Sequence, residues 1–317
     1  MTIPSWRIIF FGTPSFAVPT LKGLLEGPDE VVAAVTQPDR KKGRGQKVSS
    51  SSVKEVVSQS KERGILLFQP EKIKDEIFQE RLRDLHPDLF VVAAYGQILP
   101  GSLLEIPRNG AINVHASLLP KYRGAAPIAW AILKGEEVTG VTIMRMDEGM
   151  DTGDILLQRE ILMGDEETAE TLREKLASLG VLLVLETVIK MKRGEIFPFP
   201  QDHSQATYAP SLKKEDGRID WRREAREIDR QVRAFNPWPG AYALLDGQFL
   251  KIFKGKVREG KTGERPGGVL WVGTDFIEVG TEKGSFLLKE VQLEGKRRMS
   301  IRDFLAGHPI PVGTVFQ

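Results

Sequence analysis

The stretch WRIIFFGTPSFAVPTLKGLLEGPDEVVAAVT, Trp6 to Thr36, contains the pattern that decides the fold of the first part of the chain. Trp6–Phe11 and Val31–Thr36 are short, mainly apolar runs, which are typical of strands buried on both faces. Between them GTPS indicates a turn, and we expect Ser15 to be the N-cap of the amphipathic helix that follows. Strand, helix and strand in this order indicate a parallel sheet with a crossover helix.

The same alternation continues outward from this unit. We expect strands at about 65–68, 88–95, 111–115, 140–146 and 155–162, and helices at about 53–63, 72–85, 128–133 and 169–193. Gly194–Ser211 is rich in proline and polar residues and predicts an extended linker. Beyond one helix, at about 225–235, short alternating strands broken by glycines predict a small β-barrel. The expected domains are therefore 1–193, a linker at 194–209, and 210–317.

Composition narrows the classes of protein. Of the 317 residues 41% are hydrophobic and 28% are charged, which is ordinary for a globular protein. The absence of cysteine excludes a disulfide framework, a thiol nucleophile and a thiolate metal site. No apolar run approaches the roughly 18 residues of a membrane span, and the N-terminus lacks the regions of a signal peptide. We therefore expect a cytoplasmic protein that contacts no membrane and holds no metal.

Positive charge is concentrated in particular segments. Residues 210–317 contain 20 Lys and Arg against 15 Asp and Glu, while residues 1–209 contain 25 against 28. Pro38–Lys47 contains five basic residues, one acidic residue and no apolar one. This segment is either a solvated mobile loop or a loop that becomes ordered on a phosphate backbone. Basic residues recur around 213–214 and 296–298, so the second half is the better candidate for binding a polyanion.

Asn113 and His115 are the first candidates for chemistry. They share one face of a short strand near its C-terminal end, where ligands bind in open α/β sheets. A single histidine in an apolar context is most often structural. However, the amide of Asn113, with Arg123 in the following turn, could place donors around one carbonyl oxygen and polarise an acyl or formyl group.

A carboxylate beside His115 would favour the imidazolium, the form that can protonate a developing oxyanion. The segment MDEGMDTGDI, Met146 to Ile155, offers three aspartates for this role, Asp147, Asp151 and Asp154, and residue type does not distinguish them. The other interpretation of this segment is a plain hairpin turn. The chain lacks G-x-G-x-x-G and the Walker lysine motif, which disfavours a dinucleotide-dependent dehydrogenase and nucleotide hydrolysis.

INVHASLLPKYRGAAPI followed by GVTIMRMDEGMDTGDIL closely resembles the formyltransferases that use 10-formyltetrahydrofolate. That family shares an Asn-x-His-x-Ser-Leu-Leu-Pro element and a catalytic aspartate that begins a D-T-G element. The resemblance therefore selects Asp151 among the three aspartates. Together with Asn113 and His115, it completes the implied catalytic set.

Further motifs, from FFGTPSFAVPTL to GKRRMS, resemble in the same order the members of this family that formylate methionine on initiator tRNA. The resemblance covers residue 10 to about residue 300. It implies a Rossmann-like catalytic domain with a parallel-rich sheet, a linker and a C-terminal domain of OB-fold type. It also implies 10-formyltetrahydrofolate as formyl donor and co-substrate, initiator methionyl-tRNA as acceptor, and a monomer.

The resemblance also implies two binding regions. The expected folate contacts are Ser117, Leu118, Leu119 and Pro120, with Tyr95, Gly96, Gln97, Ile98 and Leu99. The expected tRNA contacts are Arg40, Lys41, Lys42, Arg44 and Lys47 in the basic loop, and Lys213, Lys214, Lys296, Arg297 and Arg298 in the second half. The alternatives are an amino-sugar nucleotide N-formyltransferase, a folate hydrolase that releases formate, and an RNA-binding protein without activity. The basic loop and the basic second half disfavour the first of these.

Overall fold

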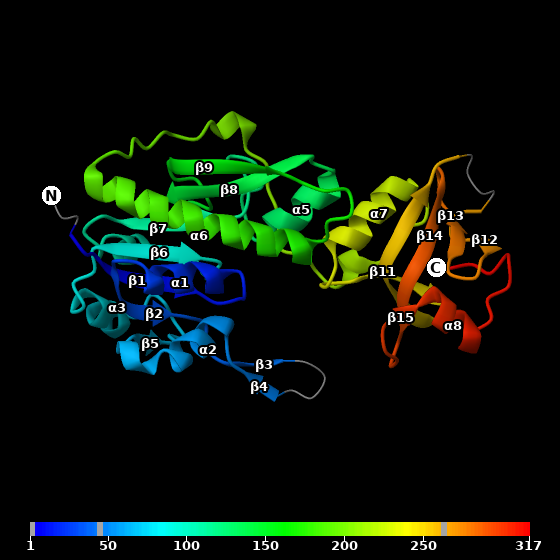
Figure 1. Ribbon diagram of the computed structural model, residues 1–317, viewed down its shortest axis with the longest axis horizontal. Coiled ribbons are helices and arrows are strands. Elements are labelled where there is room, and N and C mark those ends of the chain that lie inside the picture. The colour runs from blue at the N-terminus through cyan, green and yellow to red at the C-terminus, as the bar shows by residue number, and fades with distance from the viewer. Residues whose placement is uncertain (1–3, 43–46, 261–264) are drawn as a thin grey trace. The chain divides into compact units, whose positions relative to one another are not determined.

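The structure, a computed structural model, describes residues 4–42, 47–260 and 265–317, without the side chains of residues 41, 42 and 47 (Figure 1). The chain forms two compact units, each described by itself. Unit 1 comprises Met1–Pro127, Val138–Leu162 and Arg173–Ala209; unit 2 comprises Ile128–Glu137, Met163–Leu172 and Pro210–Gln317. No described helix is both long and apolar enough to cross a membrane.

The frame of unit 1 is a seven-stranded sheet with the order β5-β2-β1-β6-β7-β8-β9. Its strands are β1 (Arg7–Gly12), β2 (Glu30–Val35), β5 (Leu66–Phe68), β6 (Leu89–Ala93), β7 (Ala111–His115), β8 (Val138–Arg145) and β9 (Ile155–Leu162). The strands from β5 to β7 run parallel to one another, whereas β8 and β9 are antiparallel to their neighbours. This confirms the predicted α/β fold with a mostly parallel sheet.

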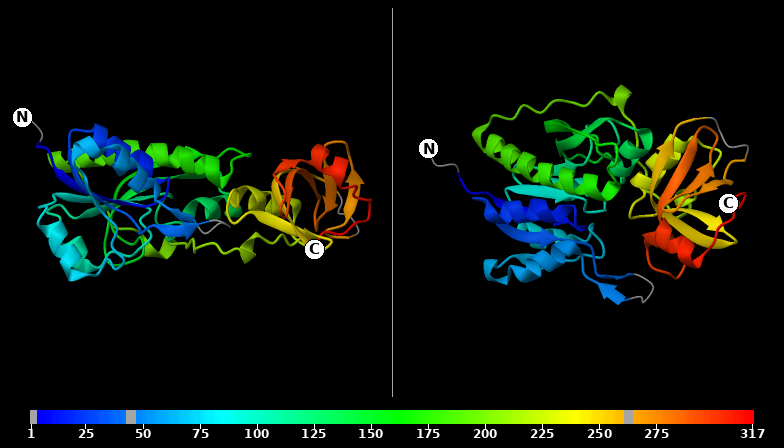
Figure 2. Two further views of the ribbon diagram at one scale, coloured as in Figure 1. Left: turned by 90° about the horizontal axis from the view of Figure 1, so that it is seen from below. Right: turned by 45° about the vertical axis from the view of Figure 1, so that its right-hand side comes forward.

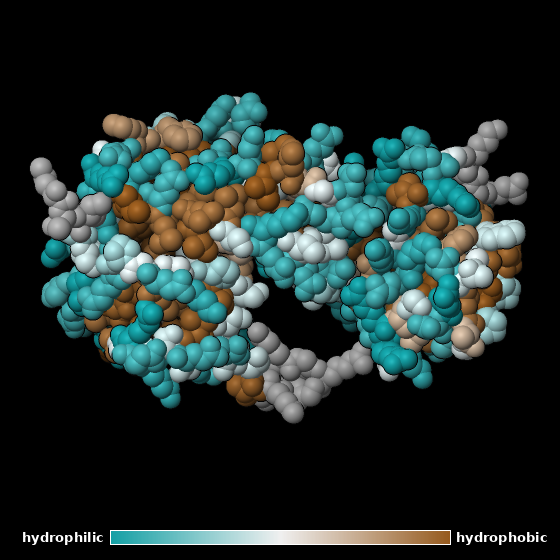
Figure 3. Space-filling view, viewed as in Figure 1, coloured by the Kyte–Doolittle hydropathy of each residue, from teal (hydrophilic) through white to brown (hydrophobic). Residues whose placement is uncertain are grey.

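Helices cover both faces of this sheet (Figure 2). On one face α1 (Ala17–Glu26) contacts α2 (Ser52–Gln59), and it packs against α6 (Ala169–Arg193), where a Cβ on Gly23 would meet Val181. On the other face lie α3 (Glu76–Arg83), which follows β5 in the chain, and α4 (Gly101–Leu104). Phe78 of α3 and Leu103 of α4 share a core with Phe90 and Val92 of β6. Apolar surface is visible along α6, where Leu182 and Ile189 are exposed (Figure 3).

The turn after β1 requires a glycine. A Cβ on Gly12 would lie 2.7 Å from Cβ of Ala17 and 3.0 Å from the carbonyl oxygen of Ala93, so a larger residue would separate the strand from its helix. The expectation that Ser15 caps α1 is wrong, because the N-cap is Phe16 and no side chain bonds to the first turn. The backbone carbonyl of Ser15 instead accepts from the N–H of Val18 at 3.2 Å.

The basic loop contains a short hairpin that the sequence did not predict. Strands β3 (Arg40–Lys42) and β4 (Lys47–Ser49) pair in antiparallel register. Its base is held by Asp39, which accepts hydrogen bonds from Nζ of Lys54 at 2.6 Å and from Nε2 of Gln69 at 2.8 Å. A 3-10 helix, η1 (Lys61–Arg63), follows α2.

Residues 194–209 run extended along unit 1, with one 3-10 turn, η2 (His203–Gln205). Phe199 pairs with Ile155, and the segment then follows the turn after β7, with Ala209 N–H donating to the carbonyl of Arg123 at 2.7 Å. The extended course was predicted, but these hydrogen bonds were not. We call residues 198–209 the docked segment.

Unit 2 is built around an antiparallel sheet with the order β10-β11-β14-β13-β12, and β15 pairs with β14. Its strands are β10 (Ala241–Leu245), β11 (Gln248–Arg258), β12 (Val269–Val272), β13 (Ile277–Gly280), β14 (Ser285–Leu293) and β15 (Met299–Ser300). One helix of this unit, α5 (Pro127–Lys134), precedes residue 210 in the chain. The others are η3 (Glu215–Gly217), α7 (Ala225–Ala234) and α8 (Ile301–Gly307). The predicted β domain is confirmed, while α8 was not predicted.

Residues 314–317 join the two ends of this strand order. Gln317 exchanges two backbone hydrogen bonds with Leu244 of β10, at 2.7 and 2.9 Å. On the other side, Val269 of β12 donates to the carbonyl of Thr314 at 2.8 Å, and Phe316 donates to Gly267 at 2.8 Å. Since the segment bonds to both β10 and β12, it closes the sheet into the expected barrel-like form. Phe316 is buried in the core of the unit beside Trp221.

Candidate active site

Asn113 and His115 occupy the C-terminal end of β7, in the interior of the sheet of unit 1. Asn113 is paired with Val92, whose side chain belongs to the core on the α3 face, so Asn113 and His115 face that side. His115 is buried, whereas Asn113 is partly exposed. The shared face of these two residues was predicted from the sequence, whereas the burial of the imidazole behind the more exposed amide was not.

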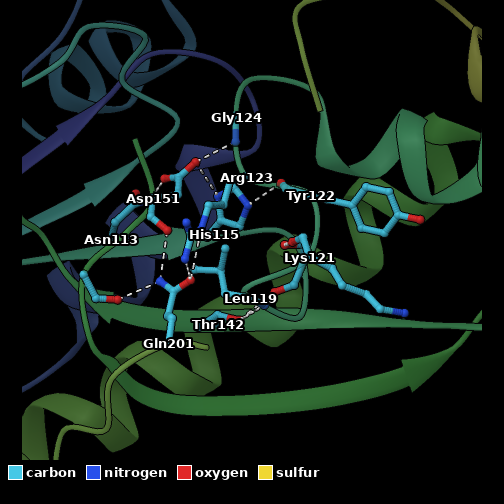
Figure 4. A network of polar contacts seen from close by, with 12 residues as sticks. Asn113, His115, Leu119, Lys121, Tyr122, Arg123, Gly124, Thr142, Asp151 and Gln201 are labelled. Carbon is cyan, nitrogen blue, oxygen red and sulfur yellow. Dashed lines mark hydrogen bonds and ion pairs between the residues drawn. The ribbon is translucent and has the colours of Figure 1, made fainter. Parts of the chain in front are cut away.

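Asp151 completes a cluster with these two residues (Figure 4). Its Oδ2 lies 3.5 Å from Nδ1 of His115, and its Oδ1 lies 3.5 Å from Nδ2 of Asn113. Asp147, a second candidate for this position, instead accepts hydrogen bonds from Thr152 and Gly149 within its own loop. The structure thus places next to His115 the aspartate that the resemblance selected.

Both ring nitrogens of His115 face hydrogen-bond acceptors. Nε2 lies 2.9 Å from the carbonyl oxygen of Tyr122, which can only accept, so Nε2 carries a proton. Nδ1 faces the carboxylate of Asp151. An ionised Asp151 also only accepts, so both contacts are hydrogen bonds when the ring is the doubly protonated imidazolium. Both N–H groups of such an imidazolium already donate to protein acceptors. It can therefore stabilise negative charge on a substrate through its own positive charge rather than by donating a further hydrogen bond.

Two residues in left-handed backbone conformation supply atoms to this cluster. Asp151 has φ 54° and Tyr122 has φ 60°, a region that residues other than glycine seldom adopt. Gly124, at φ 118°, donates its N–H to Oδ2 of Asp151 at 2.8 Å. A Cβ on Gly124 would lie 2.8 Å from the carbonyl oxygen of Ala209, so this position requires glycine. Sequence reasoning did not find these backbone contributions; the glycine of the YRG turn was the available signal.

The turn that follows β7 is fixed by Thr142 on β8. The hydroxyl of Thr142 donates to the carbonyl of Ser117 at 2.6 Å and accepts from the N–H of Leu119 at 3.1 Å. Gln158 of β9 donates to the carbonyl of Leu119 at 3.0 Å. These hydrogen bonds hold the backbone of the SLLP turn against the antiparallel edge of the sheet.

The residues expected to contact folate differ in how far they are exposed to solvent. The side chains of Tyr95, Leu99, Ser117 and Leu119 are buried, while Leu118 and Pro120 are partly exposed and Ile98 is exposed. Gly96 is exposed and Gln97, partly exposed, donates to Oε1 of Gln37 at 3.1 Å. The exposed members are those that a ligand can reach directly.

Gln201 and Arg123 were not predicted where the structure places them. Arg123 was expected beside Asn113, but its buried guanidinium donates to Oε1 of Gln201 at 2.6 and 3.1 Å and contacts Nδ1 of His203 at 3.1 Å. Gln201 in turn donates to the carbonyl of Asp151. Gln201 lies in a segment predicted to be a linker, and no spacing or residue type distinguished it there.

The basic segments of the second half meet on the outer face of β11 in unit 2. Nζ of Lys214 lies 5.6 Å from the ring centre of Phe249, and Cζ of Arg298 lies 4.4 Å from that of Phe253. Lys251 lies between these two phenylalanines on β11. Lys213, Lys296 and Arg297 are also exposed. We call Lys214, Phe249, Lys251, Phe253 and Arg298 the basic-aromatic face.

The basic residues expected to contact tRNA differ in whether their charge is already paired within the protein. Arg298 forms a bidentate ion pair with Glu290, in which Nε and Nη2 each lie 2.7 Å from a carboxylate oxygen. The charge of Arg298 is therefore already balanced. In the basic loop, the exposed Arg40 donates to Oε1 of Gln37 at 3.4 Å. Arg44 lies outside the described residues, as do the side chains of Lys41, Lys42 and Lys47. Among the described residues, no group of three His, Asp or Glu side chains could hold a metal ion.

Comparison with known proteins gives consistent results along the whole chain. Residues 6–188 match the profile of a family described as "Formyl transferase", and residues 211–309 match "Formyl transferase, C-terminal domain". A protein of Desulfotalea psychrophila named methionyl-tRNA formyltransferase is 51% identical over 99% of this chain and 96% of its own length. One of Caldanaerobacter subterraneus with the same name is 49% identical over 98% of this chain and 100% of its own.

Solved structures share the fold at lower identity. HypX from Aquifex aeolicus, in complex with tetrahydrofolic acid, has a TM-score of 0.64 at 19% identity, covering 99% of this chain and 51% of that chain. An N-formyltransferase from Helicobacter canadensis, in complex with folinic acid and dTDP-3-aminofucose, has a TM-score of 0.66 at 20% identity, covering 89% and 98%. At these identities the likeness concerns the fold.

Proposed function

Because this chain belongs to the formyl transferase family, we propose that Asn113, His115 and Asp151 carry out the reaction for which its relatives are named. The reaction is transfer of the formyl group of 10-formyltetrahydrofolate to the α-amino group of methionyl-tRNA. The observation that carries the proposal is the position of Asp151, whose carboxylate lies 3.5 Å from His115 and accepts the N–H of Gly124 at 2.8 Å.

The amide of Asn113 is the donor nearest to the surface in this cluster. One of its N–H groups points to Asp151, and for the second there is no partner among the described residues. When the neutral amine attacks the formyl carbon, the carbonyl oxygen becomes an oxyanion, and this second N–H stabilises it. One such donor contributes about 3 kcal/mol to transition-state stabilisation.

His115 and Asp151 stabilise the charge of the oxyanion and handle the proton that the amine loses. In its doubly protonated form His115 places a positive charge beside the oxyanion, and the contact of Nδ1 with Asp151 orients the ring. The attacking amine loses one proton and the leaving N10 of the folate gains one, so the transfer needs no net acid or base. Asp151, acting through a water, accepts the proton from the amine, and this proton passes to N10 as the bond between N10 and the formyl carbon breaks. The formyl group passes directly between the substrates, without a covalent intermediate on the protein.

The donor is expected to lie along the turn after β6 and the SLLP turn. Ile98 supplies exposed apolar surface there. Burial raises the pKa of Tyr95, so its hydroxyl stays neutral, and Oη is buried with no hydrogen-bond partner among the described residues. A buried polar atom of this kind is usually satisfied by a water or a ligand. These features fit an amphipathic co-substrate such as a folate.

Binding of tRNA is assigned to the basic loop and to the C-terminal domain, proposed at residues 210–317. The basic-aromatic face of β11 combines cationic side chains with exposed or partly exposed rings, the combination that binds nucleic-acid backbones and bases. Lys213, Lys296 and Arg297 add exposed charge near it in sequence. Arg298 contributes less because Glu290 neutralises it.

The test is transfer of labelled formyl from 10-formyltetrahydrofolate to three acceptors: charged initiator tRNA, charged elongator tRNA and an amino-sugar nucleotide. We expect rapid transfer to charged initiator tRNA and none to the sugar. Transfer to the sugar nucleotide with comparable kcat/KM would reject the assignment of the acceptor. Release of free formate without an acceptor would instead indicate a hydrolase.

Three finer points complete the proposal. The chain acts on the initiator form of methionyl-tRNA, as a monomer, in the cytoplasm. The order of its motifs, which resembles that of initiator-tRNA formyltransferases, supports the first two points, and the composition supports the third. The division into domains at 1–193, 194–209 and 210–317 belongs to the same proposal. Sedimentation at micromolar concentration measures the oligomeric state.

A further inference from the structure

Gln201 connects two parts of the candidate active site that are distant in sequence. Its side chain is buried, with 5% of its surface exposed. Nε2 donates to the carbonyl of Asp151 at 2.9 Å and to the carbonyl of Gly153 at 2.7 Å, while Oε1 accepts from Arg123 at 2.6 and 3.1 Å. All the hydrogen bonds of this amide are therefore made inside the protein (Figure 4).

The chemistry of the partners fixes which way the amide of Gln201 points. Arg123 can only donate, and the carbonyls of Asp151 and Gly153 can only accept. The reversed amide would face both sets of partners with the wrong group. Arg123, with 2% of its surface exposed, therefore orients Gln201, which then directs its two N–H groups at the loop that carries Asp151.

The backbone of Asp151 needs such support. Its φ of 54° is in the left-handed region, which costs free energy for a residue with a side chain and persists where the surroundings determine it. This conformation directs the carboxylate towards His115, Asn113 and the N–H of Gly124. Gln201 bonds to the carbonyl of the same residue, so it holds the peptide whose rotation would turn the carboxylate away.

The docked segment is itself fixed to the turn that faces Asp151. Thr207 accepts from the N–H of Tyr122 through its hydroxyl at 2.9 Å and from the N–H of Arg123 through its carbonyl at 2.8 Å. The carbonyl of Tyr122 is the group that accepts the hydrogen bond from Nε2 of His115. The segment thus holds Gln201 at a set position relative to both sides of the catalytic cluster.

We propose that Gln201 is a positioning residue for Asp151, acting through the backbone of the 151–153 loop and oriented by Arg123. It touches no substrate. This inference rests on the proposed function insofar as it concerns turnover, because Asp151 must take part in formyl transfer for its position to affect kcat. The position of Asp151 itself can be measured without turnover.

The experiment compares Gln201→Met and Gln201→Glu with wild type in the full chain. Both variants remove the N–H groups that bind the 151–153 loop, but only Gln201→Glu keeps an acceptor for Arg123. We expect kcat to fall in both by roughly 10- to 100-fold, the effect of displacing a catalytic group by about 1 Å, with both KM values within about twofold of wild type. Gln201→Glu should unfold at a temperature nearer to that of wild type than Gln201→Met.

The amide proton of Gly124 reports the position of Asp151 directly. Its hydrogen bond to a carboxylate at 2.8 Å shifts its NMR signal downfield, and this signal should move upfield in both Gln201 variants. Gln205→Met is the matched control, because Gln205 lies in the same segment and is exposed. It should leave kcat and the Gly124 signal as in wild type.

The outcomes separate this inference from the proposed function. If Asp151→Asn is inactive while Gln201→Met keeps wild-type kcat, the positioning role is rejected and the function stands. If kcat falls in Gln201→Met but not in Gln201→Glu, the loss follows stability and again rejects the role. If Asp151→Asn keeps wild-type turnover, the function fails, and an unmoved Gly124 signal in the Gln201 variants would then reject the positioning as well.

Discussion

Nζ of Lys54 lies 2.6 Å from the carboxylate of Asp39, at the base of the hairpin formed by β3 and β4. Lys54 is in α2, whose N-terminus is capped by Ser51, so the ion pair connects the basic loop to a fixed helix. Hydrogen bonds from Lys54 and then from Gln69 hold the pKa of Asp39 below its ordinary value. The base of the loop is thus defined by specific side chains.

Replacing Asp39 with Asn should impair the use of tRNA selectively. The loop would lose its ionic attachment to α2, so we expect kcat/KM for methionyl-tRNA to fall several-fold, while KM for 10-formyltetrahydrofolate stays unchanged. Because the pKa of Asp39 is lowered, the attachment is present at neutral pH and is lost only as pH falls through that lowered value, below 3.8. Hydrogen exchange of the β3 and β4 amides between pH 5 and 8 measures it; opening within that range would contradict the pairing.

Replacing Asn113 with Ala should lower the rate of the chemical step and leave the affinity for tRNA unchanged. Removing one oxyanion donor lowers kcat by roughly 100- to 1,000-fold, and we expect this for Asn113→Ala. Asp151→Asn should also lower kcat strongly because the carboxylate beside His115 is lost. Asp154→Asn is the matched control in the same loop, with wild-type turnover expected. Single-turnover kinetics and a tRNA filter-binding assay separate the two effects; weaker tRNA binding with normal chemistry would refute the roles given to these residues.

The basic-aromatic face should contribute to the salt dependence of tRNA binding. If Lys214 and Lys251 each contact a phosphate, replacing one with Met should lower the slope of log K against log salt by about 1. Lys283→Met is the control: Lys283 lies beyond the Ser285 end of β14, whereas the Leu293 end pairs near Lys251. Equal slopes for Lys214→Met, Lys251→Met and Lys283→Met would exclude this surface as the binding site.

Phe316 should contribute strongly to the stability of unit 2. It is 2% exposed and packs beside Trp221, with ring centres 6.1 Å apart. Phe316→Ala should therefore lower the free energy of unfolding by about 3–5 kcal/mol. Phe197, which is 82% exposed in unit 1, provides the comparison, and Phe197→Ala should change stability by about 0.5 kcal/mol or less. Urea denaturation of both variants measures the difference; similar values would contradict the closure by residues 314–317.

The parts of the fold that the sequence predicted are those with strong periodicity. β7, β9 and α6 have the predicted limits, because each is a regular pattern bounded by turn residues. The hairpin of β3 and β4 has no apolar pattern; it depends on Asp39, Lys54 and Gln69, which are distant in sequence. The hairpin interpretation of Met146–Ile155 implied that β8 and β9 pair antiparallel, as they do, but the antiparallel pairing of β8 with β7 was not predicted.

In the candidate site, too, features set by local sequence pattern were predicted, while features set by contacts between distant residues were not. Side chains on one strand face, such as Asn113 and His115, follow from alternation along β7. Residue type narrowed the partner of His115 to three aspartates, and only the family resemblance selected Asp151, since loop conformation decides which carboxylate turns inward. Gln201 and the backbone groups of Tyr122 and Gly124 were missed because their roles come from tertiary hydrogen bonds. Such contributions have no local signature.

The closure of unit 2 by residues 314–317 has a consequence during synthesis on the ribosome. These residues are made after all the strands that they connect, so β10 and β12 keep unpaired edges while the chain is growing. Exposed strand edges invite pairing with other chains. The nascent unit is therefore prone to association with other chains until residues 314–317 leave the exit tunnel and pair with both strands.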